Sequence, residues 1–189
     1  MTMTRAFILS LVFIQTLFLT VNAQTNFELP QNIELKSKDD YSKYEATMTG
    51  AAKWLEETDL DKDADKRKQV NSFVLKWVSG SPTVNVDITE QLAKIYGKNI
   101  QLLGVYLASY ASNFIQNKTS ATKFTATKAG LISMMNVYKK GIDISRSKEM
   151  EKMIRLTSDN KLDDYIFDNF KLQMIAQITF ALARKPLAK

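Results

Sequence analysis

Four aspartates at alternate positions make residues 59–65 a dense group of potential metal ligands. A calcium loop with the spacing D-x-D-x-D needs glycine at its sixth position and glutamate at its twelfth. In the frame that starts at Asp59 these positions hold Ala64 and Val70, and the frame that starts at Asp61 fails at both positions as well. We interpret the run as acids gathered at a helix N-terminus, where the backbone dipole favours negative charge, and predict no metal site.

A pair of carboxylates would offer a second kind of chemistry, the hydrolysis of glycosidic bonds. Glu56, Asp65 and Asn71 come near the spacing of phage-type lysozymes, in which Glu is followed after eight residues by Asp and after five more by Thr. The last position departs from that pattern, no glycine turn follows Glu56, and the adjacent Glu57 predicts a solvated setting, not the buried one that a catalytic acid requires. We therefore expect no glycosidase activity, and a muramidase-like, carboxylate-based hydrolase remains the alternative.

The chain contains no Cys and no His. Their absence excludes thiol nucleophiles, His-based catalytic triads, and zinc sites built on Cys or His. An enzyme with this sequence would have to work with carboxylates, Lys, Tyr or Ser. We accordingly predict no catalytic residue, no cofactor and no enzymatic activity. Without Cys the domain has no disulfides, so its stability must come from an apolar core.

Residues 77–86, Trp-Val-Ser-Gly-Ser-Pro-Thr-Val-Asn-Val, form the most distinctive local string. In one interpretation they are a helix end, stopped by Gly80 with Pro82 two residues on, and then an extended stretch whose valines fill a gap between helices. In the other, polar groups beside an exposed aromatic side chain form a binding loop. The residues of this possible binding loop are Trp77, Ser79, Gly80, Ser81, Pro82, Thr83 and Asn85.

The same string carries a resemblance to known sequences. Ala-Ala-Lys-Trp-Leu at 51–55, a Lys/Arg-rich turn, and Phe-Val-Leu-Lys-Trp-Val-Ser-Gly-Ser-Pro at 73–82 follow an export signal. Together they resemble an uncharacterised group of small secreted helical proteins of Bacteroidetes-type bacteria, with the similarity covering residues 45–115. The resemblance implies an exported helical domain and no assigned activity, so it transfers no functional residues to this chain.

Residues 1–23 have the pattern of a cleavable export signal. Arg5 provides a positive start, residues 6–21 are almost wholly apolar, and Val-Asn-Ala at 21–23 places small residues where a signal peptidase needs them. The apolar run of 16 residues is shorter than the roughly 20 residues of a membrane-spanning helix. We expect cleavage before Gln24 and a periplasmic or secreted protein without a membrane span; a retained anchor is the alternative.

The charge balance says little about partners. The chain has 26 Lys and Arg against 20 Asp and Glu, a net charge of +6, and only Arg5 of these charges lies in the predicted signal. A mild positive excess could favour anionic surfaces such as lipid head groups or cell-wall polymers. The basic residues are scattered, with no Arg-rich helix, so no nucleic-acid partner is expected.

The remaining sequence predicts an extended segment followed by helices. Apolar residues at steps of three and four indicate the helices, and an extended segment at 24–38 is expected to dock Phe27, Leu29, Ile33 and Leu35 on them. The expected helices are 39–58; one through 70–78 that ends at Gly80; a long one through 92–114, bent near Gly97 or Gly104; 124–138, closed by Gly141; a short one through 150–156; and a last helix or pair through 162–182. Asp87 is the predicted cap of the long helix, and Ser145 or Ser147 that of the short one.

These elements predict a single all-α domain over residues 39–189, an irregular antiparallel helix bundle or a short stack of helix hairpins with six to seven helices. The leading hypothesis is an exported, non-enzymatic domain that binds a protein, a peptide or an envelope component through a groove. The alternatives are the carboxylate-based hydrolase of the cell envelope and a carrier of an apolar ligand. The binder needs an exposed apolar patch, the hydrolase two carboxylates in one cleft, and the carrier an apolar cavity.

Overall fold

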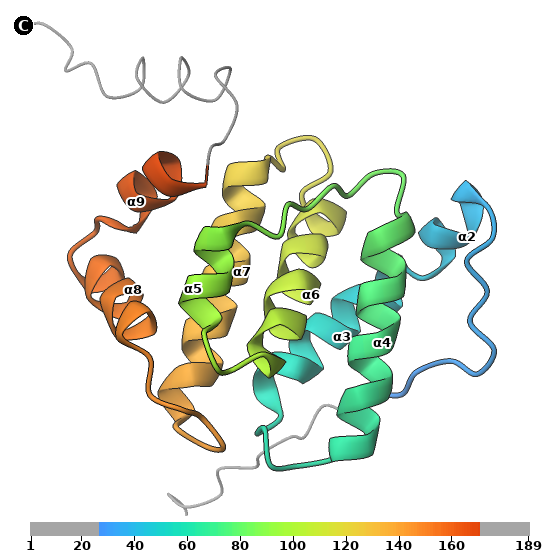
Figure 1. The fold of residues 1–189 in the computed structure, drawn as a ribbon. Coiled ribbons are helices and arrows are strands. Elements are labelled where there is room, and N and C mark those ends of the chain that lie inside the picture. The colour runs from blue at the N-terminus through green and yellow to red at the C-terminus, as the bar shows by residue number, and fades with distance from the viewer. Residues whose placement is uncertain (1–26, 171–189) are drawn as a thin grey trace, which may run out of the picture.

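The computed structural model of the chain describes residues 27–170, which form eight helices and no strands (Figure 1). The predicted all-α bundle is confirmed. Residues 1–26, with the predicted export signal, and residues 171–189, with the end of the last predicted helix, lie outside the described part. The described helices outnumber the expected six to seven because two of the predicted helices are each divided in two.

Short connections join most of the helices, and residues 81–89, between α4 and α5, form the longest connection between any two of them. The helices are α2 (Lys38–Lys43), α3 (Glu45–Glu57), α4 (Ala64–Gly80), α5 (Glu90–Tyr96), α6 (Gln101–Gln116), α7 (Lys123–Lys140), α8 (Lys148–Ser158) and α9 (Leu162–Asn169).

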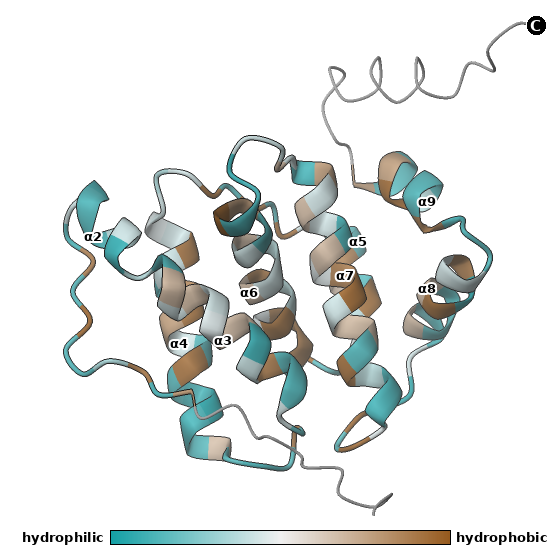
Figure 2. Ribbon diagram, turned by 180° about the vertical axis from the view of Figure 1, so that it is seen from behind, coloured by the Kyte–Doolittle hydropathy of each residue, from teal (hydrophilic) through white to brown (hydrophobic). Residues whose placement is uncertain are grey.

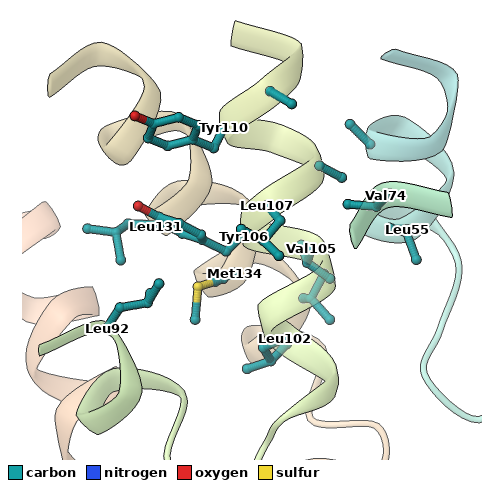
Figure 3. Packing of buried hydrophobic residues seen from close by; sticks show 14 of the residues in the cluster. Leu55, Val74, Leu92, Leu102, Val105, Tyr106, Leu107, Tyr110, Leu131 and Met134 are labelled. Atoms are coloured by element: carbon teal, nitrogen blue, oxygen red, sulfur yellow. The ribbon is translucent and has the colours of Figure 1, made fainter. Parts of the chain in front are cut away.

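α6 is the central helix, against which α7, α3 and α4 all pack (Figure 1). Leu102 and Val105 of α6 are fully buried, and Figure 3 shows them in one cluster with Val74 of α4 and Leu131 and Met134 of α7. Burying one such side chain stabilises the fold by about 1.5–3 kcal/mol. Figure 2 shows hydrophobic residues on α6 and α7 and on the helices around them. No helix within residues 27–170 combines the length and the apolar character needed to cross a membrane.

The α6–α7 contact is close because a glycine lies in it. A Cβ atom at Gly130 would lie 2.6 Å from the Tyr106 ring and 3.0 Å from the Tyr106 carbonyl oxygen. A larger residue would therefore push the two helices apart.

Two predicted helices are divided where the backbone leaves helical geometry. The predicted helix through 92–114 breaks at Gly97, whose φ of 55° and ψ of −118° suit glycine, and Gly104 lies inside α6. The predicted helix 39–58 breaks at Tyr44, with φ −104° and ψ 12°. In both cases the apolar spacing continues across the break, so the spacing alone did not reveal it.

The prediction that Asp87 is the N-cap of the helix that follows it, α5, was wrong. Thr89 caps α5, with its hydroxyl accepting a hydrogen bond from the Leu92 N–H at 3.1 Å. Asp87 instead pairs with Lys123 of α7 at 2.8 Å. Both residues are good caps, and the capping-box spacing pointed to the more distant one. Ser147, one of the two predicted caps of α8, is confirmed.

The N-terminal segment and Arg67 fix the α3–α4 corner. Arg67 is only 6% exposed and donates to the carbonyl oxygens of Thr58 and Asp59, at 2.8 and 2.9 Å, which directly follow the end of α3 at Glu57. Its guanidinium lies 5.3 Å from the centre of the Trp54 ring, and Phe27 contacts the same ring system. The residues predicted to dock are partly buried against the core, as expected: Phe27, Leu29, Ile33 and Leu35.

Candidate functional site

A groove lies where the connection 81–89 leaves α4 and crosses the end of the bundle toward α5 (Figure 1). Its volume is about 430 Å³. Its lining residues are Leu75, Val78, Ser79, Ser81, Pro82, Thr83, Val84, Asn85, Val86, Ile88 and Leu107. We call it the Leu75–Ile88 groove. None of these side chains is ionisable, so the lining offers no general acid or base.

Two large apolar side chains of the groove are open to solvent. Leu75 on α4 and Ile88 in the connection are each 53% exposed, whereas Val78 and Val84 beside them are buried. Ile100 is the third large exposed apolar residue of the described chain and does not line this groove. A single exposed apolar residue is ordinary, whereas here two of them line the same groove.

The connection is fixed to the bundle by side-chain hydrogen bonds. Ser81 Oγ accepts from the Val84 N–H at 3.2 Å, directly after the end of α4. The Tyr110 hydroxyl of α6 donates to the Asn85 carbonyl oxygen at 2.9 Å. Val84 is buried between these two contacts, and Asp87 is held by its ion pair with α7. The groove therefore has a wall of defined position.

Apart from the Val84 N–H and the Asn85 carbonyl oxygen, which bond to side chains, the backbone of residues 84–88 in this wall has no hydrogen-bond partner within the described chain. Residues 84–88 belong to no helix or strand, and they make no backbone–backbone hydrogen bond to any residue of 27–170. Backbone N–H and C=O groups need partners wherever water is excluded. A chain lying alongside residues 84–88 could supply them.

Five of the seven predicted binding-loop residues line the groove: Ser79, Ser81, Pro82, Thr83 and Asn85. Trp77 does not, because it is 1% exposed and its indole N–H donates to the Tyr41 carbonyl oxygen at 3.1 Å. The exposed aromatic side chain expected in the binding loop is thus absent at this position, because Trp77 belongs to the core. Gly80 ends α4 as predicted, and Tyr41 covers it, since a Cβ there would lie 1.9 Å from the Tyr41 hydroxyl oxygen.

Leu75 and Ile88 were not among the residues predicted for the binding loop. Leu75 lies off the apolar face that runs through Val70, Phe73, Val74, Trp77 and Val78, and Ile88 lies between the acid Asp87 and the cap Thr89. The sequence did contain a signal for both: each is an apolar residue at a position where the pattern of buried residues does not call for one.

A second groove of about 420 Å³ lies between α3 and α6, and its lining includes Glu56, Glu57 and Lys53. Glu56 had been expected to be solvated. It is in fact half-buried, and its carboxylate accepts hydrogen bonds from Ser133 and, at 2.8 Å, from Asn136 of α7. These bonds join α3 to α7 and give Glu56 a structural role.

The acid run 59–65 lies around the α3–α4 corner. Asp63 is the N-cap residue of α4 and Asp65 lies in its first turn, as predicted, while Asp59 pairs with Lys140 at 3.3 Å. Within residues 27–170, no group of three or more acidic side chains is arranged to hold a metal ion.

Two buried tyrosines of α6 lie behind the connection. Burial raises the pKa of Tyr106 to about 12, against a hydrogen bond with Thr127 that lowers it, and burial also raises the pKa of Tyr110. Both hydroxyls therefore stay neutral at ordinary pH and serve as hydrogen-bonding groups.

The chain matches no known protein family, no curated protein and no solved structure in sequence or fold comparisons.

Proposed function

We propose that this protein is an exported, non-enzymatic binding domain that takes a peptide segment of a partner into the Leu75–Ile88 groove. The pair of exposed apolar side chains on that groove carries the proposal. Export is supported by the signal pattern of residues 1–23.

An extended peptide suits both chemical features of the groove. Its main chain would hydrogen-bond to backbone groups of residues 85–88 other than the Asn85 carbonyl oxygen, which Tyr110 already occupies, as a strand adds to a free edge. Alternate side chains of an extended chain point to opposite faces, so every second one would enter the groove against Leu75 and Ile88. A volume of about 430 Å³ lies in the range of small ligand sites and accommodates a few side chains.

The lining supports binding over catalysis. Within residues 27–170 its lining has no ionisable group, so the Ser81 hydroxyl, which accepts from the Val84 N–H, has no base beside it among these residues. A serine nucleophile needs an adjacent base to become reactive.

The hydrolase remains the second candidate because Glu56 and Glu57 line one groove between α3 and α6. The hydrogen bonds of Glu56 to α7 favour a structural role, and we expect no release of fragments from labelled peptidoglycan above a boiled control. Release that disappears in Glu56→Gln would make hydrolysis the better description.

Selection from a random displayed-peptide library tests the proposal. The protein from Gln24 onward should enrich peptides that bind at least tenfold more weakly to Leu75→Ser and to Ile88→Ser. Ile100→Ser is the matched control, because it also removes a large exposed apolar side chain but lies outside the groove, and it should bind like the wild type. Enriched peptides indifferent to both groove variants, or no enrichment at all, would contradict it.

A further inference from the structure

We infer that the second groove, between α3 and α6, is a binding site for a neutral sugar of one or two rings. We call it the α3–α6 groove. It shares no lining residue with the Leu75–Ile88 groove, so this inference is independent of the proposed function and adds a second ligand.

Polar side chains of two packed helices face each other across the α3–α6 groove. Ser109, Ser112 and Gln116 follow one another on α6 at steps of three and four, so they share one face of that helix. On α3, Thr49 and Glu56 lie seven residues apart, which is two helical turns, and line the same groove. The contact between α3 and α6 therefore includes a polar strip beside its apolar core.

Ser112 is the residue that points to a ligand. It is 8% exposed and lines the groove, yet its hydroxyl makes no hydrogen bond to any residue of 27–170. The other buried residues of α6 are aliphatic or tyrosine, so packing alone does not call for a serine here. A polar group that is nearly withdrawn from water needs a partner, and a ligand in the groove would supply one.

The carboxylate of Glu56 is held in place on the α3 side of the groove. It is half-buried and accepts hydrogen bonds from Ser133 and, at 2.8 Å, from Asn136 of α7. An ionised carboxylate has about four acceptor positions, so about two of them remain for a ligand. The more exposed side chains of Lys53 and Glu57, which pair at 3.8 Å, add a donor and an acceptor.

This combination of groups suits the hydroxyls of a sugar. A sugar hydroxyl both donates and accepts, so it would donate to Glu56 and accept from Ser112 or from the Gln116 amide. Gly50 and Ala52 add a small apolar surface that suits the C–H face of a sugar ring. The volume of about 420 Å³ lies in the range of small-molecule sites.

The charges of the α3–α6 groove favour a neutral sugar over a strongly charged one. Its ionisable side chains carry both signs, with Glu56 and Glu57 negative and Lys53 positive. An anionic ligand would meet the fixed carboxylate of Glu56, and like charges at close range cost binding free energy.

An NMR titration of the isotope-labelled protein with glucose, galactose, mannose, N-acetylglucosamine and maltose tests the inference. We expect at least one of these sugars to bind saturably, with a Kd of about 10 mM or tighter, as is reasonable for so small a ligand. The amide signals that shift should belong to residues 49–57 and 109–116. No saturable binding of any of the five sugars, or shifts confined to other residues, would overturn the inference. Conversion of maltose to glucose during the titration would replace it by the hydrolase alternative.

Two serine variants test the role of the groove residues. Ser112→Ala removes only the hydroxyl and keeps a good helix former, so the fold should persist while the Kd of the sugar rises by at least about fivefold. Ser79→Ala is the matched control, because it removes a helical serine hydroxyl from the Leu75–Ile88 groove, and it should bind the sugar like the wild type. An unchanged Kd for Ser112→Ala, or an equal rise for Ser79→Ala, would contradict binding in the α3–α6 groove and leave the proposed peptide site unaffected.

Discussion

Tyr106 and Leu107 are neighbours on α6, yet they face two differently covered sides of the molecule. On the Tyr106 side a whole helix, α7, packs so closely that Gly130 is needed at the contact. On the Leu107 side the cover includes a connection without helix or strand, which leaves Leu75 and Ile88 open to solvent. A helix pairs its backbone N–H and C=O groups within itself and can bury a full stripe of side chains. This connection buries Val84, makes no backbone–backbone hydrogen bonds over residues 84–88 within the described chain, and leaves a groove beside it.

Under the proposed function, the packed side provides stability and the groove side provides recognition. Substitutions in the packed side should lower the free energy of unfolding. Substitutions of the exposed groove residues should change binding and leave the free energy of unfolding nearly as it is.

Trp77→Ala should have the largest effect on stability. Trp77 is fully buried next to the groove, so its loss creates a cavity and also leaves the Tyr41 carbonyl oxygen without its donor. We expect a loss of about 3–5 kcal/mol in the free energy of unfolding, measured by urea denaturation. Trp77→Phe keeps most of the packing and should lose less. An unchanged denaturation midpoint for Trp77→Ala would show that Trp77 does not contribute to the core. It would then count with the exposed groove residues, against the proposed division between a stabilising side and a binding side.

Gly130→Val tests the packed side directly. The added side chain would meet the Tyr106 ring and backbone, which cannot both move aside, and overpacking of this kind costs about 1–3 kcal/mol. Lys139→Val on the exposed face of the same helix is the control and should cost only the difference in helix propensity, a few tenths of a kcal/mol by rough estimate. Equal effects in thermal unfolding would show that α6 and α7 are not closely packed.

Alkaline pH should weaken the packed side through Tyr106. Its pKa is about 12 in the folded protein and about 10 in the unfolded chain, so the fold favours the neutral phenol. The stabilisation is complete below pH 10 and is lost as the pH rises from about 10 to 12, by roughly 3 kcal/mol at 1.4 kcal/mol per unit. Tyr106→Phe should lose less stability over this interval in denaturation measured at several pH values. Identical pH profiles would show that Tyr106 is not buried.

The predicted and observed folds agree where the signals are local. The spacing of apolar residues predicts the helices, and Gly80 and Ser147 mark helix ends by their own chemistry. The break at Gly97 was harder to predict because Gly104, seven residues on, looks the same in sequence but lies inside α6. The burial of Arg67 depends on carbonyl oxygens at the end of the preceding helix, which the local charge pattern does not reveal.

The groove could be predicted only in part. Residues 79–85 stood out because serine, glycine and proline end a helix and supply polar groups. The exposure of Leu75 and Ile88 depends on which elements fail to cover them, and that follows from the tertiary arrangement. Trp77 shows the converse, because a residue type enriched in binding sites is here part of the core.

Ile88→Ser should have the smallest effect on stability. The side chain is 53% exposed in wild type, so its replacement removes little buried area, and we expect a change within about 1 kcal/mol in the free energy of unfolding. Ile100→Ser, at 60% exposure, should behave alike. A loss of several kcal/mol for Ile88→Ser alone would mean that the groove side belongs to the core after all.

The dissociation constant of one library-selected peptide, measured by titration calorimetry for wild type, Ile88→Ser and Ile100→Ser, tests the central claim most directly. If the Leu75–Ile88 groove is the recognition surface, Ile88→Ser weakens binding at least tenfold and Ile100→Ser leaves it unchanged, although both remove a similarly exposed isoleucine. Equal dissociation constants for all three proteins would contradict the assignment of recognition to this groove.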